Sequence, residues 1–148
     1  MAYKTIILKG GDQTIQYEAK AGEASIYPGM FLKLQSDGDF ELQDEGETIG
    51  PKLIAVEDAL QGKTIEDAYT NTNQMLARYC PGGQLVYAYL AKNQTAVIGS
   101  FLTFSYVDPG CVKVASQSSA NLGAGVMGWA MEAVTTTSAI ARIIMLVR

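Results

Sequence analysis

Apolar residues in this chain fall into short runs separated by turn-forming residues, a pattern typical of β-strands. Asp37-Gly38 and Pro109-Gly110 have the composition of tight hairpin turns. The pattern predicts a mainly β protein with little helix. Strands are expected at residues 5–9, 14–18, 30–34, 39–42, 53–56, 74–79, 85–90, 99–104, 111–114, 128–133 and 141–147.

One stretch of the pattern occurs twice. Gly99-Ser100-Phe101-Leu102-Thr103-Phe104 resembles Gly29-Met30-Phe31-Leu32-Lys33-Leu34, and each is followed by a hairpin turn and a returning strand. Further on, an Ala-x-Glu strand occurs in both parts, ending at Glu57 and at Glu132. The repeat predicts two related strand-hairpin halves, at about 26–80 and 85–148, which pack into one compact sandwich or barrel-like body.

The N-terminal segment is interpreted separately from this body. Residues 1–22 form either a hairpin or an extended arm, and residues 23–148 form the β-rich body. A strand that a Gly-Gly hinge separates from a sheet can pair with the sheet edge of a neighbouring subunit. The candidate inter-subunit strand is Thr5, Ile6, Ile7, Leu8 and Lys9.

Helix is predicted in one place only, at Thr64–Tyr69. Thr64 can serve as the N-cap, and Glu66 and Asp67 lie in the first turn, where negative charge stabilises a helix. The segment is long enough for a turn or two.

Composition argues against catalysis. The 148 residues suffice for one domain that needs neither metal nor disulfide to fold. The absence of histidine removes the usual general base, the usual zinc ligand and the Ser-His and Cys-His pairs. We therefore expect no enzyme, no cofactor and no metal.

Charge is uneven along the chain. The formal net charge is −4, and the acidic residues concentrate between Ser36 and Asp67. An acidic face repels phosphate, so nucleic acid is not an expected partner. The N-terminus lacks the apolar core of a secretory signal, and Glu132 interrupts the apolar residues near the end. We expect a soluble protein made in a cytoplasm, with no membrane partner.

Two motifs could carry chemistry. Residues 123–128 read GxGxxG, but a polar stretch precedes them and too few residues follow for a dinucleotide-binding unit. A glycine-softened entry into a strand explains them better. Glu57 and Glu132 occupy matching places in the two halves and could form a carboxylate pair, but the same match arises if each strand simply leaves the core at its glutamate.

Cys80 and Cys111 each lie beside a tight turn. Two cysteines allow a bridge within the chain, a bridge between subunits, or two free thiols. Their spacing is not C-x-x-C, and no histidine is present to activate either one. All three alternatives stay open.

Several stretches together resemble the capsid decoration (cement) proteins of tailed bacteriophages. The central stretch is the most specific of them, and the flanking turns are weak by themselves. In order, and after the β-prone N-terminal arm, they are Ile26-Tyr27-Pro28-Gly29, Ser36-Asp37-Gly38, residues 55–69 (AVEDALQGKTIEDAY), Pro81-Gly82 before Val86-Tyr87-Ala88, Gly99-Ser100-Phe101-Leu102, and residues 126–133 (VMGWAMEA).

The resemblance implies a structural virion protein without catalytic residues. Such proteins sit on the outer surface of the assembled head, commonly as homotrimers, and clamp neighbouring major capsid subunits. Cysteines are no part of this pattern, so Cys80 and Cys111 would be a local addition. The alternative from another class is a phage-borne binding module that uses the acidic Ser36–Asp67 face to recognise a basic partner or a glycan.

Overall fold

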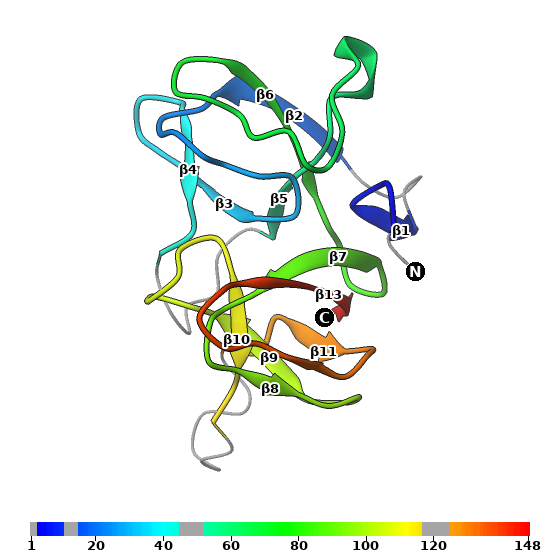
Figure 1. Cartoon of the computed structure of the whole chain (residues 1–148). Helices are drawn as coiled ribbons and strands as arrows, with labels where there is room; N and C mark the ends of the chain where they lie inside the picture. The colour runs from blue at the N-terminus through cyan, green and yellow to red at the C-terminus, as the bar shows by residue number, and fades with distance from the viewer. Residues whose placement is uncertain (1–2, 11–14, 45–51, 117–124) are drawn as a thin grey trace.

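The computed structural model describes residues 3–10, 15–44, 52–116 and 125–148. Its strands form two units, an N-terminal sheet that lies above a C-terminal barrel in Figure 1. The N-terminal sheet has the order β2 (Ile15–Lys20), β6 (Gln74–Tyr79), β5 (Leu53–Ala55), β3 (Phe31–Leu34) and β4 (Phe40–Leu42). The C-terminal barrel has the order β7 (Leu85–Leu90), β10 (Val112–Val114), β9 (Phe101–Phe104), β11 (Gly128–Ala130) and β13 (Ala141–Val147), and β13 closes it on β7.

Three short strands complete the fold. β1 (Ile7–Lys9) adds to β7, while β8 (Thr95–Ala96) and β12 (Val134–Thr135) pair only with each other. The predicted mainly β, barrel-like body with little helix is confirmed.

The two units are built on one pairing scheme. In each unit, the first of the five strands pairs with the fifth, and the fifth pairs with the fourth. The fourth pairs with the second, which also pairs with the third to form the hairpin. A parallel contact between the end of the first strand and the second hairpin strand joins the edges in both units. The equivalent pairs are Leu32–Leu42 and Leu102–Val114, Leu53–Tyr79 and Gly128–Val147, and Ala21–Phe40 and Leu90–Val112.

In this scheme β2 is one of the strands of the N-terminal sheet. β2 pairs with β6 along its whole length, from Ile15 opposite Tyr79 to Lys20 opposite Gln74. The boundary predicted at residue 22 therefore cuts through the first unit, which begins at β2 and not at residue 26. The alternation of Ile15 and Tyr17 predicts a strand but says nothing about a partner far along the chain.

The predicted helix at Thr64–Tyr69 is wrong. The Asp67 carboxylate accepts hydrogen bonds from the backbone amide of Thr64 at 2.8 Å and from its hydroxyl at 2.9 Å, which closes a turn instead. A short 3-10 helix, η2 (Ala59–Gln61), forms just before it, with Asp58 as its N-cap. No helix in the described ranges is long and apolar enough to cross a lipid bilayer.

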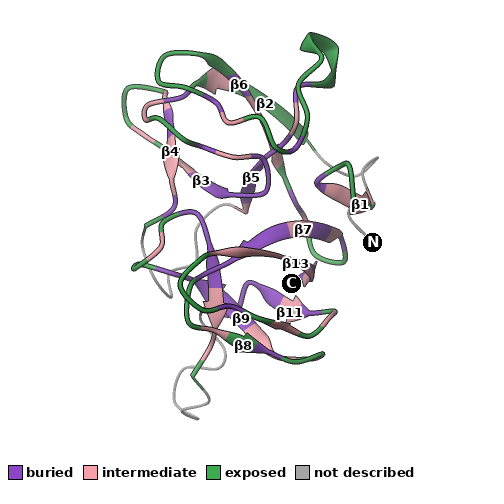
Figure 2. Cartoon of the chain, in the orientation of Figure 1, coloured by how far each residue is buried: buried purple, intermediate pink, exposed green. Residues whose placement is uncertain are grey.

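The two units share a hydrophobic core. The rings of Phe31 in β3 and Phe104 in β9 meet edge to face with their centroids 5.2 Å apart. Ile54 of the N-terminal sheet and Val86 of the barrel are fully buried in the same cluster. Figure 2 shows the buried residues concentrated along β3, β5 and β7, where the units meet. We expect neither unit to keep its stability without the other.

Arg142, on β13, joins the two units through polar contacts. Its guanidinium donates to the carbonyl of Pro28 at 2.9 Å and to the carbonyl of Ile65 at 2.6 Å. It also lies over the ring of Tyr89, 4.4 Å from the centroid. A barrel side chain thus satisfies two backbone acceptors of the N-terminal unit.

The N-terminal segment pairs within its own chain. Sequence analysis allows a hairpin of residues 5–9 with 14–18, but β1 and β2 lie in different units, and Ile7 is opposite Val86 of β7. The Ile6 carbonyl accepts from the amide of Tyr87 at 2.8 Å, and the Ile6 side chain is fully buried. Crossing to a neighbouring subunit stays a prediction, and it would require β1 to leave this site.

The burial of Ile6 makes the segment part of the stability of the domain. Replacing Ile6 with alanine is expected to lower the free energy of unfolding by about 2–4 kcal/mol, because it leaves a cavity between β1 and the barrel. Urea unfolding measures the change, with Lys9→Ala, an exposed position at the end of β1, as the control. An unchanged midpoint for Ile6→Ala would mean that β1 does not pack on β7 in solution.

Candidate interaction surfaces

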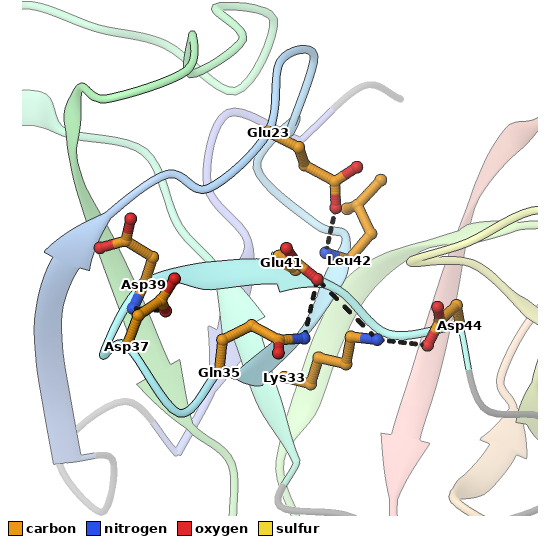
Figure 3. A network of polar contacts seen from close by, with 8 residues as sticks. All are labelled: Glu23, Lys33, Gln35, Asp37, Asp39, Glu41, Leu42 and Asp44. Carbon is orange, nitrogen blue, oxygen red and sulfur yellow. Dashed lines mark hydrogen bonds and ion pairs between the residues drawn. The ribbon is translucent and has the colours of Figure 1, made fainter.

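The acidic segment is divided between two places in the fold. On the β3–β4 hairpin, the Lys33 ammonium lies 2.6 Å from Asp44 and 3.9 Å from Glu41, as Figure 3 shows. The hydrogen bond from Lys33 lowers the pKa of Asp44. Asp37, at the hairpin turn, accepts from the amide of Asp39 at 3.0 Å. Most acidic side chains of the hairpin are therefore engaged in hydrogen bonds or ion pairs within the hairpin.

The other acidic residues serve the connection between β5 and β6. Asp58 caps η2, and Asp67 closes the turn at Thr64, whose hydrogen bonds lower the pKa of the Asp67 carboxyl. Glu66 lies 3.7 Å from the Arg142 guanidinium. Glu45 and Glu47 lie outside the described residues. The predicted acidic face is thus largely made of caps, turns and local ion pairs.

Glu57 and Glu132 each bind a backbone amide. Glu57 accepts from Ile6 at 3.2 Å, and Glu132 accepts from Ile144 at 2.8 Å. A small pocket beside Glu57 is lined by Thr5, Ile7, Val56 and Arg78, and Glu132 is not among its lining residues. Each glutamate fixes a neighbouring strand, which fits the interpretation of Ala-x-Glu as the point where a strand leaves the core.

The glycine-rich motif ends at the start of β11. Residues 123 and 124 lie outside the described ranges, but Gly128 is described and pairs with Val147 of β13. A Cβ atom at Gly128 would lie 2.2 Å from the carbonyl oxygen of Leu146. This glycine is required for the close approach of two backbones, as the interpretation of a glycine-softened strand entry predicts.

Both cysteines are free thiols in the core. Cys80 packs in the shared cluster of the two units, and Cys111 packs with Met30 and Tyr89 at the junction. Within the single chain the two thiols are not bonded to each other, and the bridge between subunits stays a prediction. Burial raises the pKa of each thiol to about 12, so neither has the reactive thiolate that a redox or catalytic cysteine needs.

The buried thiols make the fold sensitive to alkali. The unfolded chain loses these protons near pH 9 and the folded chain near pH 12, so the stabilisation is complete below pH 9 and is lost as the pH rises toward 12. The free energy of unfolding should fall in this window by about 1.4 kcal/mol per pH unit for each thiol. Guanidinium unfolding at several pH values measures the slope. The double variant Cys80→Ala/Cys111→Ala should have a shallower one, and an equal slope would contradict the assignment.

An apolar groove opens on the N-terminal sheet. Its volume is about 400 Å³, and Tyr17, Leu34, Phe40 and Tyr79 are among the residues that line it. Leu34 is 57% exposed although its side chain lies on the interior face of the sheet. β2 borders the groove and is exposed along most of its length, as Figure 2 shows. Exposed apolar residues in such a cluster are typical of a binding surface.

A second apolar surface lies on the barrel. Val97 and Ile98 are 58% and 71% exposed, and they lead directly into Gly99 and β9. The rings of Phe101 and Trp129 have their centroids 6.5 Å apart. Both residues alternate along their strands with the core residues Leu102 and Ala130, which places them on the outside of the barrel.

The fold of the chain occurs in a known virion component. The N base of head fiber gp8.5 in bacteriophage phi29 matches it with a TM-score of 0.56 and 12% sequence identity, over 91% of this chain and 94% of that chain. The chain shares its fold with this head fiber base. No protein-family model matches the sequence, and no curated protein matches it either. At this identity the head fiber base establishes the fold, and the function has to be argued separately.

The residues that matter most for these surfaces have little signal in the sequence. Tyr17 and Leu34 have the spacing of core residues, and the pattern alone does not reveal that the interior face of the N-terminal sheet is open beside them. Arg142 gives no signal in the sequence, because its two hydrogen bonds go to backbone carbonyls far along the chain. The apolar pair Val97-Ile98, directly before Gly99, is the feature of the sequence that could have indicated an exposed apolar loop.

Proposed function

We propose that the chain is a structural protein of a tailed-phage virion. In this proposal it binds the outer surface of the assembled head and stabilises it by clamping neighbouring major capsid subunits. It acts through its surfaces and not through catalysis. The observation that carries the proposal is the match to the phi29 head fiber base over nearly the full length of both chains, which agrees with the resemblance to decoration proteins.

The structure offers what such a role needs. The two units share one core, so the body can transmit a load between two attachment points. Two apolar surfaces, the groove beside β2 and the patch at Val97 and Ile98, remain available for neighbours. We further propose that the protein acts on the head as a homotrimer, with the major capsid protein as its partner.

Titration of the purified chain onto expanded heads that lack it tests the proposal. Sedimentation of the heads gives the bound number, and we expect saturation near one copy for each major capsid subunit. Saturated heads should also release their DNA at a higher temperature than bare heads. The double variant Leu34→Glu/Ile98→Glu places a charge on each apolar surface. Loss of head binding by this variant would indicate binding through these surfaces, and unchanged binding would indicate the acidic segment.

Two outcomes would contradict a clamping role. Binding at a handful of sites per particle would point to the alternative binding module, and charge reversal at Asp37 and Asp39 would then test its acidic face. No binding at all would remove the head surface as the partner.

A further inference from the structure

The junction between the two units is a docking contact with two sides. On one side, Pro28, Gly29 and Phe31 of the N-terminal unit form an inner docking face, together with Ile54. Phe31 packs on Phe104 of the barrel, and the carbonyl of Pro28 accepts from Arg142. Gly29 approaches so closely that a Cβ atom there would lie 2.7 Å from the carbonyl oxygen of Tyr87.

The barrel carries an equivalent of this face. The Gly99 amide donates to the carbonyl of Ala130 as the Gly29 amide donates to that of Ala55, and Phe101 is opposite Trp129 as Phe31 is opposite Ile54. We call Val97, Ile98, Gly99, Phe101 and Trp129 the outer docking face. Its loop is open among the described residues: Val97 and Ile98 are more than half exposed, and a Cβ atom at Gly99 would have no described neighbour within 4 Å.

The N-terminal sheet carries the equivalent of the other side. In the common pairing scheme, Leu34 stands where Phe104 stands and Gln74 stands where Arg142 stands. On the first strand, Tyr17 corresponds to Val86 and Glu18 to Tyr87. Val86 and Phe104 are buried by the inner docking face and β1, whereas Tyr17 and Leu34 line the exposed groove.

We infer that the outer docking face of one copy binds the apolar groove of a second copy, repeating between chains the junction that joins the two units within one chain. Phe101 would then cover Leu34 as Phe31 covers Phe104. The side-chain amide of Gln74 would donate to the carbonyl of Ile98, in the place of the Arg142 to Pro28 hydrogen bond. The groove and the outer docking face are both apolar, and every copy of the chain carries both surfaces.

This contact is head-to-tail, because the two surfaces of one chain are different. After two copies bind, one keeps a free groove and the other keeps a free face, so further copies add until the assembly closes into a ring or continues as a filament. This contact specifies how copies of the chain would associate in the proposed function, and it rests on that function for the role of the association. The contact itself is deduced from the strand pairing of the chain alone.

A complementation experiment in solution tests it. Leu34→Glu blocks the groove and Ile98→Glu blocks the outer docking face, and both side chains are more than half exposed, so the fold should tolerate the changes. By sedimentation velocity we expect the unchanged chain to associate with rising concentration and each variant to stay monomeric. An equimolar mixture of the two variants should form a 1:1 dimer, because one supplies a face and the other a groove.

Two further measurements sharpen the result. Trp129 is the sole tryptophan of the sequence and lies on the outer docking face, so its emission should shift to shorter wavelength as the unchanged chain associates. Leu60→Glu is the matched control, since Leu60 is 98% exposed and belongs to neither surface. It should associate as the unchanged chain does.

Three outcomes would overturn the inference: an unchanged chain that is monomeric up to its solubility limit, variants that associate as well as the unchanged chain, or a mixture that stays monomeric. Association of the Ile98→Glu variant by itself would indicate that groove binds groove instead. Because no heads are used, each of these failures leaves the head-binding proposal to its own test, and absent head binding would leave the head-to-tail contact in place.

Discussion

Replacing Arg142 with alanine is expected to lower the free energy of unfolding by roughly 3–5 kcal/mol. The change removes two charge-assisted hydrogen bonds and leaves the carbonyls of Pro28 and Ile65 unpaired at a junction where water has little access. It also removes the guanidinium from the ring of Tyr89. Urea unfolding followed by circular dichroism measures the loss.

Two variants show whether the geometry or the charge of Arg142 matters. Arg142→Lys keeps the charge but not the planar fork that reaches two carbonyls at once, so it should recover only a minor part of the stability. Lys33→Ala removes a cation from an ion pair that is partly open to solvent and should cost no more than about 1 kcal/mol. If Arg142→Ala were as mild as Lys33→Ala, the junction would not depend on these hydrogen bonds.

Replacing Gly128 with alanine is expected to cost roughly 3–5 kcal/mol. A Cβ atom there would lie 2.2 Å from the Leu146 carbonyl oxygen and 2.7 Å from the terminal methyl carbon of Met145. The Met145 side chain can move, but the Leu146 backbone is held in the β11–β13 pairing. The barrel must open between these strands, and that loss exceeds the usual cost of overpacking.

Gly38→Asn provides the control for this variant. A Cβ atom at Gly38 would have no neighbour within 4 Å, and asparagine tolerates the left-handed backbone of that turn. Its thermal midpoint should be close to that of the unchanged chain, while that of Gly128→Ala should fall by many degrees. Similar midpoints would mean that β11 and β13 are further apart in solution.

The positions of the strands in the two units could be predicted from the sequence because each is a local signal, whereas the two-residue strands β8 and β12 were too short to predict. The run Leu85–Leu90 and the hairpin signal around Asp37-Gly38 both appear where they were predicted. The relation between the halves could also be predicted, since the residues around Phe31 and Phe101 occupy the same register positions.

The parts that escaped prediction depend on contacts between residues far apart in the chain. Ile6 has the pattern of an exposed arm or of a hairpin, and only its placement against Tyr87 makes it a core residue. Thr64 and Asp67 can begin a helix or close a turn, and the choice was made by the extended backbone that brings Tyr69 to Ile26. Leu34 and Phe104 occupy the same position in their units, so their different exposure comes from the neighbour each one has.

Comparison of the two units also indicates which loops can differ in length without changing the strand pairing. The pairing scheme is the same in both units although the β9–β10 turn is longer than the β3–β4 turn, and although only the β5–β6 connection carries η2. Leu60, at the tip of that connection, is almost fully exposed. A foreign peptide inserted between Leu60 and Gln61 should therefore be displayed without disturbing either unit, which would make this chain a scaffold for presenting epitopes.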